Sequence, residues 1–132
     1  MNNGLVIDHF GIKFWYLDDQ LHREDGPAIE YPDGEKRWYL DGKLHREGGP
    51  AIEDVNGTKE WYRYGKRHRK DGPAAEYPNG SKFWFLNGKC HREDGPAVEF
   101  VDGRKKWHLN GKEIPCSSQE EFERLLKLKI FW

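Results

Sequence analysis

Hydrophobic and polar residues alternate along short segments of this 132-residue chain, and turn sequences separate those segments. In residues 27–31 (PAIEY) and 36–40 (KRWYL), aromatic and branched residues recur at alternating positions, as expected of short strands. The intervening Pro32-Asp33-Gly34 suits a three-residue hairpin loop, a type I turn that ends in a left-handed glycine. The pattern predicts a β-hairpin over these residues.

The same pattern recurs every 23 residues. Four units align without a gap, at 21–43, 44–66, 67–89 and 90–112, and residues 11–20 match the second half of a unit. A tryptophan holds the same place in each: Trp15, Trp38, Trp61, Trp84 and Trp107. A fixed period of this length indicates a repeat protein.

Each unit has a second turn signal, LDGK or LNGK, which becomes RYGK in the second unit. If every turn signal and the His-Arg motif closed a hairpin, each unit would hold three strands. The chain direction would then reverse at each unit, and identical residues would meet alternating environments. We therefore expect one two-stranded hairpin per unit and an ordered connector carrying the His-Arg motif. Stacked hairpins would form an all-β, single-layer antiparallel meander.

The predicted register places Glu30 opposite Lys36 and Ala28 opposite Trp38, with equivalents in every unit. Cross-strand pairs of opposite charge contribute about 0.2–1 kcal/mol each. A hairpin advances the stack by about 10 Å, so each tryptophan would contact the next unit. We expect these tryptophans to form an apolar core spine.

The two ends differ from the repeats. Residues 1–20 can supply a capping hairpin that is part of a repeat, whereas 113–132 change to a helical period. Ser117 with Glu120, or Ser118 with Glu121, forms a capping box before an apolar face of Phe122, Leu125, Leu126 and Ile130. We expect a capping helix of about three turns folded on the last hairpin, with docking to a partner as the alternative use of this segment.

Composition narrows the classes of function. The chain is 36% hydrophobic and 34% charged, yet 14% aromatic, which suits a folded protein with a thin core in a single domain. Because 22 basic residues nearly balance 23 acidic ones, no global field favours nucleic acid or anionic membranes. We expect neither a signal peptide nor a membrane span. Cys90 and Cys116 are expected to be free thiols in the cytoplasm.

The His-Arg motif has residue types found in metal and catalytic sites, but the spacing between repeats does not suit such a site. The motif histidines would lie about 10 Å apart, whereas two nitrogens on one zinc ion lie within about 4 Å. Serine and threonine are rare, and none stands in a nucleophile motif. We therefore expect no enzyme, catalytic residue, metal or cofactor. The histidines and arginines should pack over Trp or Tyr and bond connector carbonyls, and the acids Asp25, Asp71 and Asp94 should cap the turn before Gly-Pro.

The 23-residue period, the Asp-Gly and Gly-Lys turns and the recurring His-Arg-Glu-Asp-Gly-Pro-Ala sequence resemble the MORN repeat family over residues 11–112. The closest likeness is to MORN-like variants of phages and large viruses and to antitoxin-type bacterial proteins. This resemblance implies a curved or twisted sheet that serves as an interaction scaffold.

Residues that break the repeat are the candidates for binding. Five cations lie within 63–70: Arg63, Lys66, Arg67, Arg69 and Lys70. The sheet face opposite the tryptophans carries Tyr39, Tyr62 and Phe85, of a kind enriched at interfaces. The first hypothesis is a module that binds a host protein, such as a defence protein, and blocks it sterically. The alternatives are a toxin–antitoxin partner, a homodimer, and a binder of phosphate ligands or nucleic acid through 63–70.

Overall fold

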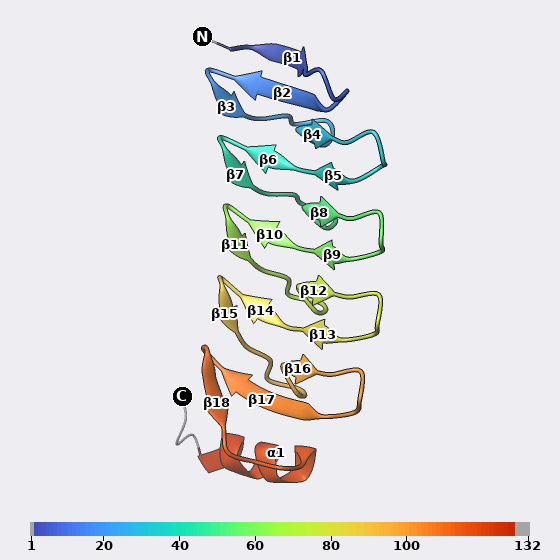
Figure 1. Ribbon diagram of the computed structural model, residues 1–132. Coiled ribbons are helices and arrows are strands. Elements are labelled where there is room, and N and C mark those ends of the chain that lie inside the picture. The colour runs from blue at the N-terminus through green and yellow to red at the C-terminus, as the bar shows by residue number, and fades with distance from the viewer. Residues whose placement is uncertain (1, 129–132) are drawn as a thin grey trace. The chain divides into compact units, whose positions relative to one another are not determined.

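The computed structural model describes residues 2–128 (Figure 1). The chain comprises two compact units, Met1–Lys66 and Arg67–Trp132. The boundary falls between the second and third repeats, so each unit contains two whole repeats.

The first unit is an antiparallel meander of hairpins in sequence order. Its main sheet consists of β1 (Gly4–Ile7), β2 (Lys13–Leu17), β4 (Ile29–Glu30), β5 (Lys36–Arg37), β8 (Ile52–Glu53) and β9 (Lys59–Glu60). In the same sheet, β3 (Gln20–Leu21) also pairs with β2, whereas β6 (Tyr39–Leu40) pairs with β7 (Lys43–Leu44) in a separate two-stranded sheet. The corresponding segments of the second repeat are β10 (Tyr62–Arg63) and β11 (Lys66–Arg67).

The second unit has the same plan and ends in a helix. Its sheet consists of β12 (Ala75–Glu76), β13 (Lys82–Phe83), β16 (Val98–Glu99), β17 (Lys105–Leu109) and β18 (Lys112–Ile114). A side hairpin pairs β14 (Phe85–Leu86) with β15 (Lys89–Cys90), and α1 (Gln119–Leu128) follows β18. The all-β meander with a short C-terminal helix is therefore confirmed.

The predicted main hairpin is also confirmed in detail. Tyr31 N–H donates to Glu35 O at 3.0 Å, Gly34 N–H donates to Tyr31 O, and Gly34 has a φ of 101°. Glu30 faces Lys36, and the equivalent acid–base pair recurs in the other repeats. Neighbouring repeats add further pairs, such as Lys36 with Glu53, so opposite charges alternate across each sheet.

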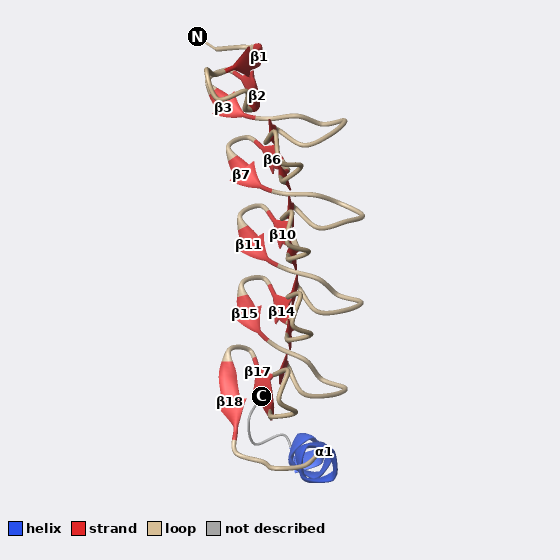
Figure 2. Ribbon diagram, turned by 45° about the vertical axis from the view of Figure 1, so that its right-hand side comes forward, coloured by secondary structure: helices blue, strands red, loops and turns tan. Residues whose placement is uncertain are grey.

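The expectation of one hairpin per repeat is wrong. The Asp-Gly signal closes a second hairpin, whose strands β6 and β7 turn away from the main sheet (Figures 1 and 2). Asp41 and Gly42 have φ values of 49° and 77°, as a type I′ turn requires. Because each repeat then has two hairpins, the strand count stays even and identical residues keep identical environments.

The tryptophan spine is also wrong for most repeats. Trp38 N–H donates to Ala51 O of the next repeat, and Trp38 itself is only half-buried. The short strands instead bury small and branched side chains: Ala28, Ile29, Ala51 and Ile52 in the first unit, and Ala74, Ala75, Ala97 and Val98 in the second. A tryptophan indole is too large to enclose completely in a single layer of strands.

Among the tryptophans that the structure describes, Trp107 is the buried one, because the helix covers it. Trp107, Leu109, Ile114 and Phe122 form one core cluster. Ser118 Oγ accepts the Glu121 N–H at 3.1 Å, which selects the second of the two predicted capping boxes. The predicted Ile130 contact lies outside the described residues. Within residues 2–128, no helix is long and apolar enough to cross a membrane.

Candidate functional site

In three of the repeats, the motif arginine is held in a stack with the preceding tryptophan. Arg46 Cζ lies 3.8 Å from the Trp38 ring centroid, and its Nη1 donates to Pro50 O at 3.1 Å. A Cβ on Gly49 would lie 2.8 Å from the same Cζ, so the guanidinium covers the glycine. Equivalent stacks join Arg23 to Trp15 and Arg92 to Trp84.

Each motif histidine holds the tight turn at the end of its own repeat. His22 Nδ1 accepts the Asp41 N–H at 2.9 Å, and His45, His68 and His91 accept the equivalent N–H groups of Tyr64, Asn87 and Asn110. Nδ1 must be unprotonated to accept, so the neutral ring carries its hydrogen on Nε2. We expected these rings to bond connector carbonyls, and that expectation is wrong.

The aspartates of the motif accept hydrogen bonds from the motif arginines. Asp25 accepts from Arg23 Nε at 3.1 Å, and Asp71 and Asp94 accept from their arginines in the same way. The motif therefore supports the architecture, through arginine stacking that was expected and a histidine contact that was not. No group of three or more His, Cys, Asp or Glu side chains among the described residues is placed to hold a metal ion.

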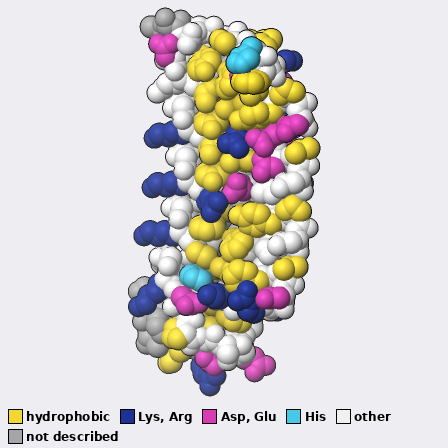
Figure 3. Space-filling model, viewed as in Figure 1, with side chains coloured by type: hydrophobic (Ala, Val, Ile, Leu, Met, Phe, Trp, Pro, Cys, Tyr) yellow, Lys and Arg dark blue, Asp and Glu magenta, His cyan; other side chains and the backbone are white. Residues whose placement is uncertain are grey.

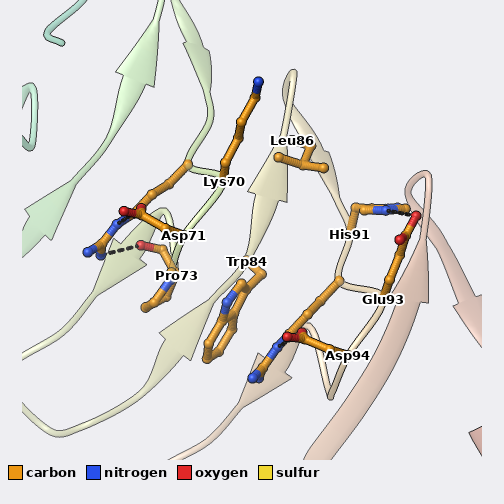
Figure 4. A pocket seen from close by; sticks show the side chains of 11 residues that line it. Lys70, Asp71, Pro73, Trp84, Leu86, His91, Glu93 and Asp94 are labelled. Carbon is orange, nitrogen blue, oxygen red and sulfur yellow. Dashed lines mark hydrogen bonds and ion pairs between the residues drawn. The ribbon is translucent and has the colours of Figure 1, made fainter. Parts of the chain in front are cut away.

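Each unit also has a groove between consecutive motif segments. In the first unit a groove of about 600 Å³ is lined by Trp38, Leu40 and His45 between residues 23–27 and 45–47. In the second unit the equivalent groove, also about 600 Å³, has Trp84 at its centre, with Pro73 to one side and Asp94 to the other (Figure 4). Lys70 lies on this second groove where the other repeats have glutamate.

The opposite face of the second unit's sheet carries an aromatic cluster. The Phe83 ring makes edge-to-face contacts with Tyr77 at 5.5 Å and Phe100 at 5.9 Å between centroids. Arg104 Cζ lies 4.7 Å from the Phe100 ring. All three aromatic residues are half-buried, and hydrophobic side chains gather over the strands in the space-filling view (Figure 3).

The same face of the first unit is more polar. Arg37 and Glu35 form an ion pair at 3.1 Å, and Asp54 replaces the aromatic residue that the other repeats have there. Burial raises the pKa of Glu35, and the nearby Asp54 carboxylate raises it further, while Arg37 opposes both effects. The equivalent sheet faces of the two units are thus chemically different.

The predicted basic site is only partly available for binding. Arg69 donates to Asp71, Pro73 O and Glu76, and Arg67 lies over the Phe85 ring at 5.5 Å. The predicted aromatic residues Tyr39, Tyr62 and Phe85 are half-buried in β6, β10 and β14. The exposed predicted cations are Arg63 and Lys66 in the first unit and Lys70 in the second.

Sequence reasoning missed Tyr64, which has the strongest local signal for a special role. It holds the tight-turn position that Asp or Asn holds elsewhere, its φ is 47°, and 57% of its surface is exposed. Its ring contacts His45 at 4.2 Å. A bulky residue with positive φ is unusual, and such strain is often found at functional sites. The sequence signal was the change from Asp-Gly or Asn-Gly to Tyr-Gly.

Comparison with known proteins gives no family for this chain. No family model matches it, and no curated protein matches it. The geometry of the repeats therefore carries the functional argument.

Proposed function

We propose that this protein is a non-enzymatic binding module that occupies a partner protein's surface through one face of its hairpin sheet. The observation that carries the proposal is the Tyr77–Phe83–Phe100 cluster of the second unit. Aromatic side chains are enriched in the buried centres of protein interfaces. From the MORN-like resemblance, we further propose that this is a viral or bacterial protein that acts in the cytoplasm. It would bind a host protein, such as a defence protein, and modulate it sterically.

Each repeat combines constant positions with variable ones, and this pattern supports the proposal. The residues that hold the scaffold recur: the stacked arginine and tryptophan, the turn-binding histidine, and the paired glutamate and lysine. The sheet face, in contrast, changes from repeat to repeat, with Arg37, Glu60, Phe83 and Lys106 at one position. A constant scaffold with a variable face is typical of a protein that recognises another surface.

The repeats themselves supply substitutions that suit the fold. Tyr77→Asp with Phe83→Glu gives the third repeat the residues that the second repeat has at Asp54 and Glu60. Lys70→Glu is the matched control, since glutamate holds that place in the other repeats and position 70 lies on the groove. The experiment is affinity capture from nuclease-treated bacterial lysate, followed by titration of the purified partner with each variant.

The expected result is a stoichiometric partner that binds the wild type and the Lys70→Glu control but not the double variant. A partner lost only with Lys70→Glu would move the site to the groove. The phosphate or nucleic-acid alternative predicts instead that binding weakens steeply with salt and needs Arg63, Lys66 and Lys70. Turnover of a substrate by the purified protein would contradict the whole proposal.

A further inference from the structure

Within residues 2–128, β1 pairs only with β2, so it is the apolar outer edge of the first unit's sheet. Of the nine large hydrophobic side chains that are exposed within the described residues, five lie in and beside the first hairpin: Leu5, Val6, Ile7, Phe10 and Leu17. Sheet edges are normally protected by charged residues, proline or bulges. Residues 2–7 contain none of the charges or prolines that give this protection.

The alternating charges of the sheet stop at this edge. Lys13 of β2 faces Glu30 on one side, as the inner lysines face glutamates, but it faces Ile7 on the other. Leu5 faces Trp15 in the same way. A strand that carried the usual Glu or Lys of this sheet would therefore set a charge against Leu5 or Ile7, whereas an uncharged strand would not.

The backbone of β1 is also ready to pair on its outer side. Trp15 uses both of its main-chain groups away from β1, since its N–H donates to Ala28 O and its O accepts the His22 N–H. The opposite residue, Leu5, must therefore direct its N–H and C=O outward, and Ile7 does the same by alternation. Next to this strand, Asn2 uses its main-chain N–H and C=O to bond Asp19, and Asn3 accepts the Asp18 N–H with its side-chain oxygen.

We propose that β1 pairs with β1 of a second copy of this chain, antiparallel about a two-fold axis at Val6. In this register Leu5 of one copy exchanges both N–H···O bonds with Ile7 of the other, which satisfies the outward groups. Gly4 then faces Asp8 of the other copy, and Asp8 is occupied with its own turn through the Phe10 and Ile12 N–H groups. No like charges meet, and leucine packs against isoleucine on one face.

Charge-complementary variants test both the pairing and its register. Leu5→Glu and Ile7→Lys should each weaken self-association at least about tenfold in sedimentation velocity over a concentration series. Mixing the two variants should restore a dimer, because the new Glu and Lys then face each other across one side of the axis. Val101→Lys is the matched control, since Val101 is 63% exposed in a loop far along the sequence from β1, and it should dimerise as the wild type does.

Hydrogen exchange of the wild-type protein tests the same pairing without any substitution. The Leu5 and Ile7 amides should exchange hydrogen more slowly as protein concentration rises, whereas the Val101 amide should not respond. A wild type that stays monomeric, a dimer that both variants leave intact, or a mixture that stays monomeric would each overturn the proposal. The proposed partner-binding face lies elsewhere, so these results are independent of the capture experiment.

Discussion

Arg46 Cζ lies 3.8 Å from the centroid of the Trp38 ring, and a Cβ on Gly49 would lie 2.8 Å from that same carbon. The guanidinium is thus enclosed between the indole of one repeat and the backbone of its own connector. Arginine suits this place because its flat guanidinium stacks on an aromatic ring while its edge still donates hydrogen bonds. The relationship explains why arginine, glycine and tryptophan recur together.

Replacing Gly49 with alanine should displace the guanidinium and lower the free energy of unfolding by about 1–2 kcal/mol, through the lost stacking and the weakened bond to Pro50 O. The cost should disappear when Arg46 is already alanine, because no guanidinium then occupies the space. Urea unfolding of the two single variants and the double variant measures this coupling. Additive effects would show that the stack is not what requires glycine.

Phe122 should be the most costly single truncation in the helix. Its side chain is fully buried, and its ring lies 6.3 Å from that of Trp107. Phe122→Ala should lower the free energy of unfolding by about 3–5 kcal/mol. Leu128→Ala, at a position that is 62% exposed, is the control and should change it by less than about 0.5 kcal/mol. Equal effects in chemical denaturation would mean that the helix does not seal the core.

The sequence predicted those parts of the fold that depend on contacts between neighbouring residues in the chain. The loop at Gly34 and the Glu30–Lys36 pair follow from local turn geometry, and the Ser118 cap follows from a local motif. The second hairpin was missed because Asp41 and Gly42 predict a turn without showing that its flanks pair.

The remaining errors concern distant contacts. The bond from the Asp41 N–H to His22 Nδ1 joins residues 19 apart, and no local pattern specifies it. The burial of Trp38 was overestimated because the enclosure of a side chain depends on the strands assembled around it. The main-sheet strands next to Trp38 are only two residues long, which the sequence does not reveal. The special role of Tyr64 was missed because it depends on a positive φ. The sequence hints at this φ only by placing tyrosine where the other repeats have Asp or Asn in the turn.

His108 should make stability depend on pH. Burial holds the pKa of His108 below its usual value; Glu113 opposes this shift and Lys106 adds to it. The folded protein therefore binds this proton less readily than the unfolded chain, so the contribution of His108 is lost as pH falls below about 6.5. Phenylalanine, which the third repeat has as Phe85, removes the titration.

The measurement is the difference in free energy of unfolding between the wild type and His108→Phe. As pH falls from about 7.5 to 5.5, this difference should shift against the wild type, because only the wild type must exclude the proton. A difference that stays constant over this range would show that His108 is protonated equally in both states.

Cys90 should react slowly with thiol reagents while the protein is folded. Burial raises the pKa of the Cys90 thiol to about 11, so little thiolate exists near neutral pH. In a Cys116→Ser variant, reaction with an aromatic disulfide reagent should be slow in buffer and should accelerate in urea. Cys90→Leu in the same background, with the residue of the first two repeats, is the control for background signal. Rapid reaction in buffer would contradict the burial of this thiol.

Tyr64→Asn should stabilise the protein although it removes an aromatic contact. Asn87 and Asn110 hold the equivalent turn position at φ values of 49° and 51°, where asparagine is better tolerated than tyrosine. The gain should be about 0.5–1 kcal/mol, reduced by the lost contact between Tyr64 and His45. Asn87→Tyr makes the reverse change in the next repeat and should lower stability by a similar amount.

Chemical denaturation of the two variants separates the contributions of strain and ring contact. If Tyr64→Asn destabilises while Asn87→Tyr is neutral, the contact with His45 outweighs the backbone strain, and Tyr64 needs no functional explanation. If Tyr64→Asn stabilises the fold and also weakens binding of the captured partner, Tyr64 contributes to partner binding at a cost in stability. Tyr64 would then contact the partner or position a residue that does, because it costs stability and improves binding.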